Sequence, residues 1–222
     1  MTPNAIACSD WRLYVIVDRT TAKTRDLAEV AEAAIRGGAD VLQLRDKAAS
    51  DEALIEEARR LLRLTRRAGI PLIINDRPEV ARAVGAEGVH LGQEDLPLSA
   101  ARRRLGPNAI LGQSTHSLAQ ARAAEADGAD YIGCGPVFAT PTKPDAVSIG
   151  LGLIAEVGSQ VRVPVVCIGG IDQATLPQVL AAGATRVAVV RAVCGAADPE
   201  TVVRTLKHLL AQAARANAAP PV

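Results

Sequence analysis

Short runs of apolar and β-branched residues recur along the 222-residue chain, separated by longer stretches in which apolar residues follow a helical spacing. Runs of this length suit β-strands. The pattern predicts eight strands, at residues 11–18, 39–46, 70–76, 87–92, 109–114, 129–135, 163–170 and 185–191.

Most of the intervals between these strands predict amphipathic helices. The interval 50–69 begins at Ser50, a favourable N-cap, and ends at Gly69, a favourable C-cap. Further helices are expected at 25–38, 117–128, 172–183 and 198–215. Pro177 must then lie in the first turn of its helix or at a kink.

A Gly-Ala motif precedes every second predicted strand, within residues 37–40, 84–88, 127–130 and 182–185. Glycine at this place suits the tight loop that leads from a helix into a strand. Eight β/α units predict a single-domain α/β protein, a (β/α)8 TIM barrel. The alternative is an open doubly wound sheet, which normally has fewer strands, and no GxGxxG motif follows the first strand here.

The barrel is expected to span residues 11–215, with an N-terminal extension at 1–10 and a flexible C-terminal tail at 216–222. The first ten residues do not have the pattern of a signal peptide, and no apolar segment reaches membrane-spanning length. The four cysteines show no CxxC spacing, which favours buried, reduced thiols in a cytoplasmic protein.

Composition argues against several classes of partner. The formal net charge is only +1, so no overall field attracts the molecule to nucleic acid or to a membrane surface. Aromatic residues make up 2% of the chain, which leaves few side chains on which bases could stack. We therefore expect small-molecule ligands, and the Ala- and Leu-rich exterior would permit a homodimer.

Polar residues gather where the predicted strands end, which is the face that carries the chemistry in a TIM barrel. They are Asp18; Gln43, Arg45, Asp46 and Lys47; Asn75, Asp76 and Arg77; His90, Gln93, Glu94 and Asp95; Ser114 and His116; the segment 135–143; Gly169 and Gly170; and Arg191. Together they predict a lined pocket.

Several of these groups favour a phosphate-containing ligand. The segment 135–143, GPVFATPTK, places hydroxyl groups and a lysine in a proline-stiffened loop, and Gln43, Arg45 and Lys47 alternate along one side of their strand. The pair Gly169-Gly170 precedes a helix, where backbone N–H groups bind phosphate readily. Arg45 has an alternative role as the ion-pair partner of a carboxylate inside the barrel.

Two carboxylates and two histidines allow more than one interpretation. Asp76 and Asp95 follow adjacent strands and could hold Mg²⁺, which takes few protein oxygens, or could cap the helices that follow them. His90 and His116 could act in acid–base catalysis, but we favour structural hydrogen bonds to backbone or carboxylate groups.

An ordered set of motifs closely resembles the thiamine phosphate synthase family, also called thiamine-phosphate pyrophosphorylases. The motifs are LQLRDK (42–47), IINDR (73–77), GVHLGQEDLP (88–97), GQSTHS (112–117), GADYIGCGPVFATPTK (128–143) and CIGGI (167–171). The resemblance covers essentially the whole barrel. It implies that 4-amino-2-methyl-5-(diphosphooxymethyl)pyrimidine and a thiazole phosphate are joined, with Mg²⁺, into thiamine monophosphate and pyrophosphate.

The resemblance also implies roles for individual residues. Those implied for the pyrimidine diphosphate are Gln43, Leu44, Arg45, Asp46, Lys47, Asn75, Ser114 and Lys143, of which Lys47, Ser114 and Lys143 are the catalytic candidates. Those implied for the thiazole phosphate are Thr140, Pro141, Thr142, Gly170, Val190 and Arg191. Asp76 and Asp95 are the implied Mg²⁺ ligands. Arg191 departs from the family pattern, which often has a small, serine-like residue there.

Other functions remain open from the sequence. A thiazole tautomerase paralogue would bind the same thiazole phosphate without a diphosphate site, and another phosphate-binding barrel could be an isomerase or aldolase. A non-catalytic sensor of thiamine precursors is a third alternative. The oligomeric state and the preferred form of the thiazole are not determined, and we expect the run 140–150 to close over the substrates.

Overall fold

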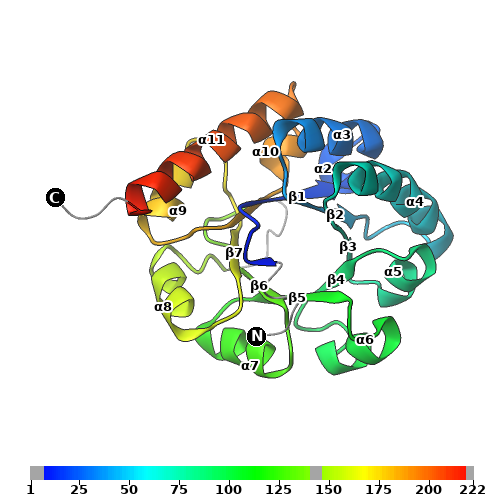
Figure 1. Ribbon diagram of the computed structural model, residues 1–222, viewed down its shortest axis with the longest axis horizontal. Coiled ribbons are helices and arrows are strands. Elements are labelled where there is room, and N and C mark those ends of the chain that lie inside the picture. Colours follow the sequence, from blue (N-terminus) through cyan, green and yellow to red (C-terminus); the bar gives the residue numbers. More distant parts are fainter. Residues whose placement is uncertain (1–7, 141–146, 219–222) are drawn as a thin grey trace.

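The computed structural model describes residues 8–140 and 147–218, and within them eight parallel strands close into a barrel in sequence order (Figure 1). The ring closes where β8 pairs with β1, with Val187 opposite Leu13. The strands are β1 (Leu13–Asp18), β2 (Val41–Arg45), β3 (Leu72–Asn75), β4 (Gly88–Leu91), β5 (Ile110–Thr115), β6 (Tyr131–Cys134), β7 (Val165–Ile168) and β8 (Val187–Val189). The predicted (β/α)8 barrel is confirmed, and the open sheet is wrong.

The observed strands are shorter than the apolar runs that predicted them. The predicted run 185–191 contains a strand of three residues, because Val190 already caps the short helix α10 (Arg191–Cys194) and Arg191 is its first residue. Apolar character therefore extends past the paired backbone into the loops that surround the barrel mouth.

The five helices expected from the sequence are present as α3 (Leu27–Gly37), α4 (Asp51–Ala68), α7 (Leu118–Ala126), α9 (Leu176–Ala181) and α11 (Pro199–Ala218). Ser50 caps α4 by accepting the amide of Ala53 at 3.3 Å, and Gly69 ends the helix in the left-handed region. Pro177 lies in the first turn of α9. Other intervals contain α2 (Arg19–Ala22), α5 (Pro78–Val84), α6 (Leu98–Leu105) and α8 (Gly152–Gln160).

Both chain ends differ from the expected boundaries. Helix α11 continues to Ala218, past the predicted start of the tail, because its alanine-rich end has high helix propensity. At the other end, Cys8 is fully buried and Arg186 donates to the carbonyl of Ser9, so the last residues of the expected extension pack on the barrel.

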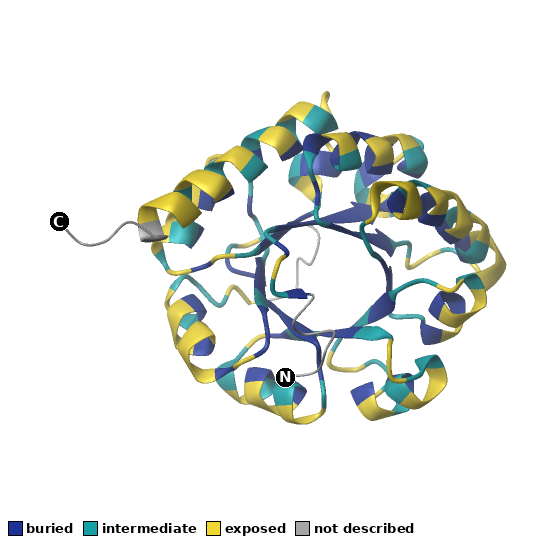
Figure 2. Cartoon of the chain, in the orientation of Figure 1, coloured by how far each residue is buried: buried dark blue, intermediate teal, exposed yellow. Residues whose placement is uncertain are grey.

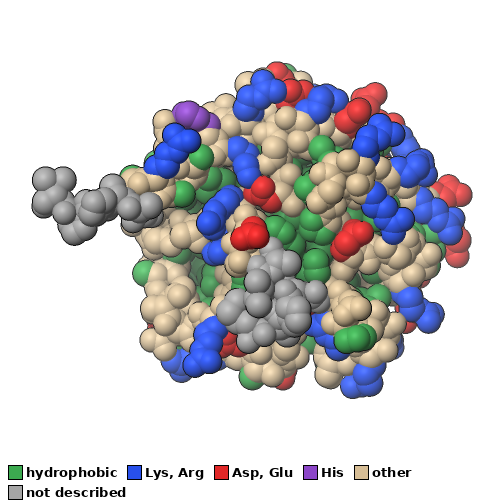
Figure 3. Space-filling model, in the orientation of Figure 1, with side chains coloured by type: hydrophobic (Ala, Val, Ile, Leu, Met, Phe, Trp, Pro, Cys, Tyr) green, Lys and Arg blue, Asp and Glu red, His purple; other side chains and the backbone are tan. Residues whose placement is uncertain are grey.

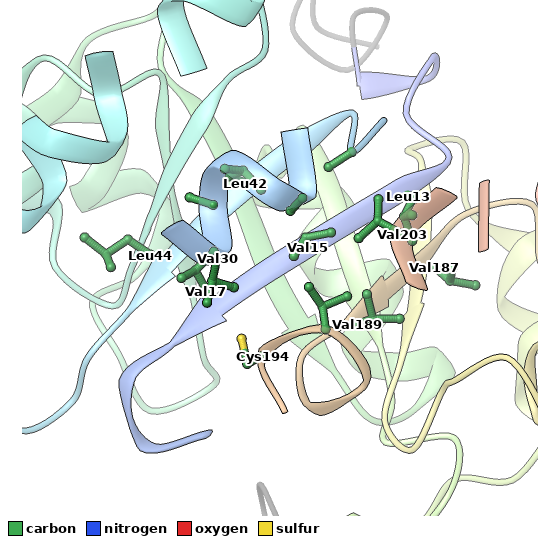
Figure 4. Packing of buried hydrophobic residues seen from close by; sticks show 14 of the residues in the cluster. Leu13, Val15, Val17, Val30, Leu42, Leu44, Val187, Val189, Cys194 and Val203 are labelled. Carbon is green, nitrogen blue, oxygen red and sulfur yellow. The ribbon is translucent and has the colours of Figure 1, made fainter. Parts of the chain in front are cut away.

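The hydrophobic core has two layers because side chains alternate along each strand. Leu13, Val15 and Val17 lie in the outer layer, with residues of the surrounding helices such as Val30 and Val203 (Figure 4). The inner layer, inside the barrel, contains Trp11, Tyr14, Ile16, Val41, Ile73, Tyr131, Val166 and Ala188. Burial is concentrated in the strands and on the inward helix faces (Figure 2).

Acidic residues that follow the Gly-Ala motifs fasten the amino ends of the strands. Asp40 accepts the amides of Arg12 and Leu13, Glu87 accepts that of Leu72, and Asp130 accepts that of Leu111, all at 2.8–2.9 Å. In each case the acid before an even-numbered strand binds the start of the preceding odd-numbered strand. The Gly-Ala motifs and the acids after them therefore stabilise the barrel at the amino ends of the strands, on the face opposite the strand carboxyl ends.

The thiols and the surface charges agree with the expectations from composition. Cys8, Cys134, Cys167 and Cys194 are free and buried, and burial raises the pKa of Cys134 to about 11. On the face seen in Figure 3, side chains of both charges are interspersed around the rim. No helix in the described part of the chain is long and apolar enough to cross a membrane.

Glycine inside the barrel makes room for a large neighbour. Gly112 on β5 lies opposite Tyr131 on β6, and a Cβ atom at Gly112 would come within 2.1 Å of the tyrosine ring. Tyr131 is 1% exposed and fills this space. The small residue on one strand thus determines where the large one lies on the next.

We expect Gly112→Ala to lower the free energy of unfolding by about 1–3 kcal/mol, because the added methyl group overpacks the barrel interior. Chemical denaturation would measure the change. The matched control is Gly158→Ala on α8, where nothing lies within 4 Å of the added atom. An equal effect of the two substitutions would contradict the packing role of Gly112.

Candidate active site

One cavity opens at the carboxyl ends of the strands, and its empty volume is about 1170 Å³, part of which is open to solvent. Its walls bring together residues that lie far apart in the sequence. The predicted site residues that line it are Gln43, Arg45, Asn75, Ser114, Thr140, Gly170, Val190 and Arg191. They come from β2, β3 and β5 and from the segments that follow β6, β7 and β8.

A continuous hydrogen-bonded chain crosses the floor of this cavity. Gln43 donates to the Tyr14 hydroxyl at 2.8 Å, and the Tyr14 and Tyr131 hydroxyls are 3.0 Å apart. His90 joins Tyr131 at 3.0 Å through Nδ1 and Ser114 at 2.9 Å through Nε2. The Gln43 amide and the Ser114 hydroxyl therefore have fixed orientations, from opposite ends of one network.

Both tyrosines in this chain remain neutral hydrogen-bonding groups. Burial is the main reason that the pKa values of Tyr14 and Tyr131 are raised well above the usual range. Trp11 packs edge-on against both rings, with centroid distances of 5.9 and 5.2 Å. An apolar floor thus supports a line of oriented polar groups.

The sequence interpretation missed Tyr14 and Tyr131 as cavity residues. Their signal was alternation, because Tyr14 shares a strand face with Asp18 and Tyr131 shares one with Gly133. His90 bonds to two hydroxyl groups rather than to the expected backbone or carboxylate. His116 does bond to a backbone group, the carbonyl of Gly135.

Arg45 forms the internal ion pair that was its alternative role. Its guanidinium lies 2.5 Å from Asp18, whose side chain is 1% exposed. Asp18 also accepts from the backbone and hydroxyl of Thr21 at the start of α2. Since Arg45 still lines the cavity and carries five N–H donors, the pair orients the guanidinium without occupying all of it.

Asp76, Asp95 and Lys47 form a cluster at the rim. Lys47 Nζ lies 3.3 Å from an Asp76 oxygen. Burial and the adjacent Asp95 carboxyl raise the pKa of Asp76, and Lys47 opposes that shift. The capping alternative is wrong, because α5 and α6 begin without a side-chain cap. Asp95 instead accepts the amide of Gly92 at 2.6 Å.

The two carboxylates are suited to a partly solvated Mg²⁺ rather than to a closed metal site. In the part of the chain that the structure describes, no group of three or more His, Cys, Asp or Glu residues could hold a metal. Mg²⁺ typically uses one or two carboxylates and completes its shell with water and phosphate oxygens. The donor set therefore fits Mg²⁺ when a phosphate ligand supplies the remaining oxygens.

Gly169 and Gly170 let the segment after β6 approach the end of β7. Phe138 donates to the Gly169 carbonyl at 3.1 Å, and both glycines have positive φ. A Cβ atom would lie 2.5 Å from Pro136 at the first position and 2.8 Å from Phe138 at the second. This close backbone packing forms the side of the cavity at β7. In the ring, β7 lies opposite β3 and β4, the strands that Asp76 and Asp95 follow.

The remaining predicted site residues do not line the cavity or lie beyond the described residues. The Leu44 side chain is buried in the outer layer (Figure 4), and Asp46 accepts the amides of Ala48 and Ala49 in its own loop. Lys47 is 60% exposed at the rim. The expectations for Pro141, Thr142 and Lys143, and most of the closing run 140–150, fall on residues 141–146, outside the described residues.

Comparisons with known proteins agree on one family. The model of the family described as thiamine monophosphate synthase matches residues 13–193. The thiamine-phosphate synthase of Chloroflexus aurantiacus is 52% identical over 202 residues, covering 90% of this chain and 93% of that protein. The enzyme of the same name from Shouchella clausii is 45% identical, covering 92% and 99%. The solved thiamine phosphate pyrophosphorylase from Pyrococcus furiosus has a TM-score of 0.84 at 38% identity, covering 91% and 96%.

We expect Tyr131→Phe to lower the free energy of unfolding by about 1–3 kcal/mol, because two buried hydrogen bonds of the interior chain are lost. A double-mutant cycle with Tyr14→Phe should give an interaction energy of about 0.5–3 kcal/mol. Tyr131→Phe and Ser159→Ala, on the outer helix α8, should be additive. Additivity of the two tyrosine substitutions would contradict an energetically linked chain.

Proposed function

Because this chain belongs to the thiamine monophosphate synthase family, we propose that its cavity joins 4-amino-2-methyl-5-(diphosphooxymethyl)pyrimidine to 4-methyl-5-(2-phosphooxyethyl)thiazole and releases pyrophosphate. The chain is an enzyme of thiamine monophosphate synthesis. The observation that carries the finer proposal is the division of the cavity. The Arg45 guanidinium, the amides of Gln43 and Asn75 and the Ser114 hydroxyl lie on β2, β3 and β5, and the backbone of Gly169, Gly170 and Val190 lines the opposite side, after β7 and β8.

The pyrimidine diphosphate would occupy the side of Gln43, Asn75 and Ser114. The fixed amide of Gln43 and hydroxyl of Ser114 suit a heteroaromatic ring with both donors and acceptors. Arg45 and Lys47 would face the diphosphate, and Lys143 would complete this side. Charge-assisted hydrogen bonds of this kind are about twice as strong as neutral ones.

Asp76 and Asp95 would hold Mg²⁺ beside the diphosphate. The ion supplies Lewis-acid neutralisation of the negative charge that develops on a departing pyrophosphate. The proximity of the two carboxyls, which raises the pKa of Asp76, supports this assignment because a cation between them would relieve their repulsion. Lys47, which already faces Asp76, would be available to the same phosphate oxygens.

The thiazole phosphate would occupy the opposite side, against Thr140, Gly170 and the backbone at Val190 and Arg191, with Pro141 and Thr142 alongside. Backbone N–H groups of the segment around Gly170 and of the start of α10 would be the donors to the phosphate. Anchoring the phosphate there would direct the thiazole ring nitrogen toward the centre of the cavity. Two anchored substrates then meet with their reactive atoms in register.

The reaction itself needs little from the protein beyond binding and electrostatics. The bond between the pyrimidine methylene carbon and the diphosphate oxygen breaks, and its electron pair leaves with pyrophosphate. The aminopyrimidine stabilises the resulting cation, and the lone pair of the thiazole nitrogen forms the new C–N bond. Arg45, Lys47 and Lys143 would stabilise the leaving group, and the apolar floor around Tyr14 and Tyr131 would limit access of water to the cation.

The tautomerase alternative finds less support in the described residues. A tautomerase acting on the thiazole phosphate has no need for a carboxylate pair beside Lys47 or for the paired Arg45.

The four free thiols agree with a cytoplasmic location, which we propose together with the activity.

The test of the proposed function is a pyrophosphate-release assay with purified protein. We expect release only when both substrates and Mg²⁺ are present, with loss of release in EDTA and thiamine monophosphate identified by mass spectrometry. Binding of the thiazole phosphate without any release would instead favour the tautomerase or the sensor.

The same assay tests the metal ligands. We expect Asp76→Asn and Asp95→Asn each to raise the Mg²⁺ concentration for half-maximal rate, by at least the ~10–100-fold typical of losing a metal's outer partner. Asp127→Asn, at the exposed end of α7, is the matched control. Wild-type Mg²⁺ dependence in either rim variant would refute the assignment.

We expect Arg191→Ser to leave the KM for the thiazole phosphate unchanged. The reason is that backbone N–H groups would bind the phosphate, while the Arg191 side chain is exposed at the start of α10. Steady-state kinetics with the pyrimidine substrate saturating would measure it. A raised KM would show that the guanidinium itself binds the phosphate.

A further inference from the structure

Arg77 joins the loops that follow β2 and β3, although it does not line the cavity among the described residues. Its Nη1 atom donates to the carbonyl of Ala49 at 2.7 Å and to Asp51 at 2.9 Å. Its Nη2 atom donates to the carbonyl of Lys47 at 3.2 Å. One planar guanidinium thus holds three points of the neighbouring loop.

The backbone beside Arg77 is strained where Asp76 must face Lys47. Asp76 has φ of +62°, and the amide of Arg77 donates to the carbonyl of Asn75 at 2.8 Å, so the chain makes a tight turn centred on Asp76. Such a conformation costs a non-glycine residue roughly 1–3 kcal/mol and persists only where the surroundings enforce it. Pro78, the first residue of α5, restricts the backbone of Arg77, which directly follows the turn, and the side-chain contacts of Arg77 hold it against the neighbouring loop.

Lys47 needs such support. Its side chain is 60% exposed, and it pairs with Asp76 across the gap between the two loops. A flexible lysine loses about 2 kcal/mol of rotamer entropy when it is held in one conformation. Arg77 holds both the backbone of Lys47 and the turn that carries its partner, Asp76. This limits the positions that the Lys47 ammonium group can reach.

We propose that Arg77 is a positioning residue, which sets the Lys47 ammonium group against the diphosphate by tying its loop to the turn at Asp76. The inference rests on the proposed function for the identity of the diphosphate. Arg77 acts through Lys47 and does not itself contact the substrate. The other contacts of the loop, in which Asp46 accepts two amides and Ser50 caps α4, shape it locally but do not join it to β3.

The test is a double-mutant cycle of Arg77→Lys and Lys47→Ala. Arg77→Lys keeps the charge, but one ammonium group cannot reproduce the planar fork that reaches two carbonyls and Asp51. Two quantities are measured for each variant: kcat/KM for each substrate, and the Kd of inorganic pyrophosphate with Mg²⁺ by titration calorimetry. Thermal unfolding is followed in parallel.

We expect Arg77→Lys to lower kcat/KM for the pyrimidine diphosphate by about 10–100-fold, since misplacement of a group by about 1 Å can cost that much. The KM for the thiazole phosphate should not change, and pyrophosphate binding should weaken. In the Lys47→Ala background the same substitution should have little further effect on either quantity.

Three outcomes would overturn the proposal: wild-type kinetics and pyrophosphate binding in Arg77→Lys, a raised KM for the thiazole phosphate, or the same fold-change in both Lys47 backgrounds. Arg82→Lys is the control, because Arg82 lies on α5, the helix that follows Arg77, and pairs with Glu79 at the surface, 3.2 Å away. If the wild-type protein releases no pyrophosphate, the proposed function fails. The pyrophosphate-binding cycle then decides the role of Arg77 by itself.

Discussion

The pairing of β8 with β1 is the constraint on which the rest of the structure depends. Eight parallel strands that close into a ring place all their carboxyl ends on one rim and leave no free edge. Residues as far apart in the sequence as Tyr14 and Arg191 therefore line one cavity. The helices that return the chain between strands stay outside, where they bury the outer faces of the strands (Figure 2).

The two ends of this ring have different tasks. At the amino ends, Asp40, Glu87 and Asp130 bind the starts of neighbouring strands and are paired with Lys207, Arg66 and Arg102. At the carboxyl ends, charged groups are brought close without full neutralisation, as at Asp76 and Asp95. The paired carboxylates at the amino ends stabilise the fold. The two neighbouring carboxylates at the rim are instead suited to a ligand or ion that brings its own charge.

Between the two ends, small and large residues divide the barrel interior. Gly112 leaves the space for the Tyr131 ring, and the Tyr131 hydroxyl then joins Tyr14 to His90. The hydrogen-bonded chain across the cavity floor is thus a consequence of packing below it. A substitution that moves the ring would also move the groups at both ends of the chain, Gln43 and Ser114.

The sequence by itself determined the eight strands, the parallel barrel and most of the cavity-lining residues, because alternation and helix periodicity are local properties of the chain. The order of its motifs also identified the family. Only the tertiary structure decided which partners these residues have. The ion pair of Arg45 with Asp18, the chain from Gln43 to Ser114, and the reach of Arg77 to the loop of Lys47 join residues on different strands or loops. Their distances depend on the closed ring and on the space that glycine leaves, which no local pattern encodes.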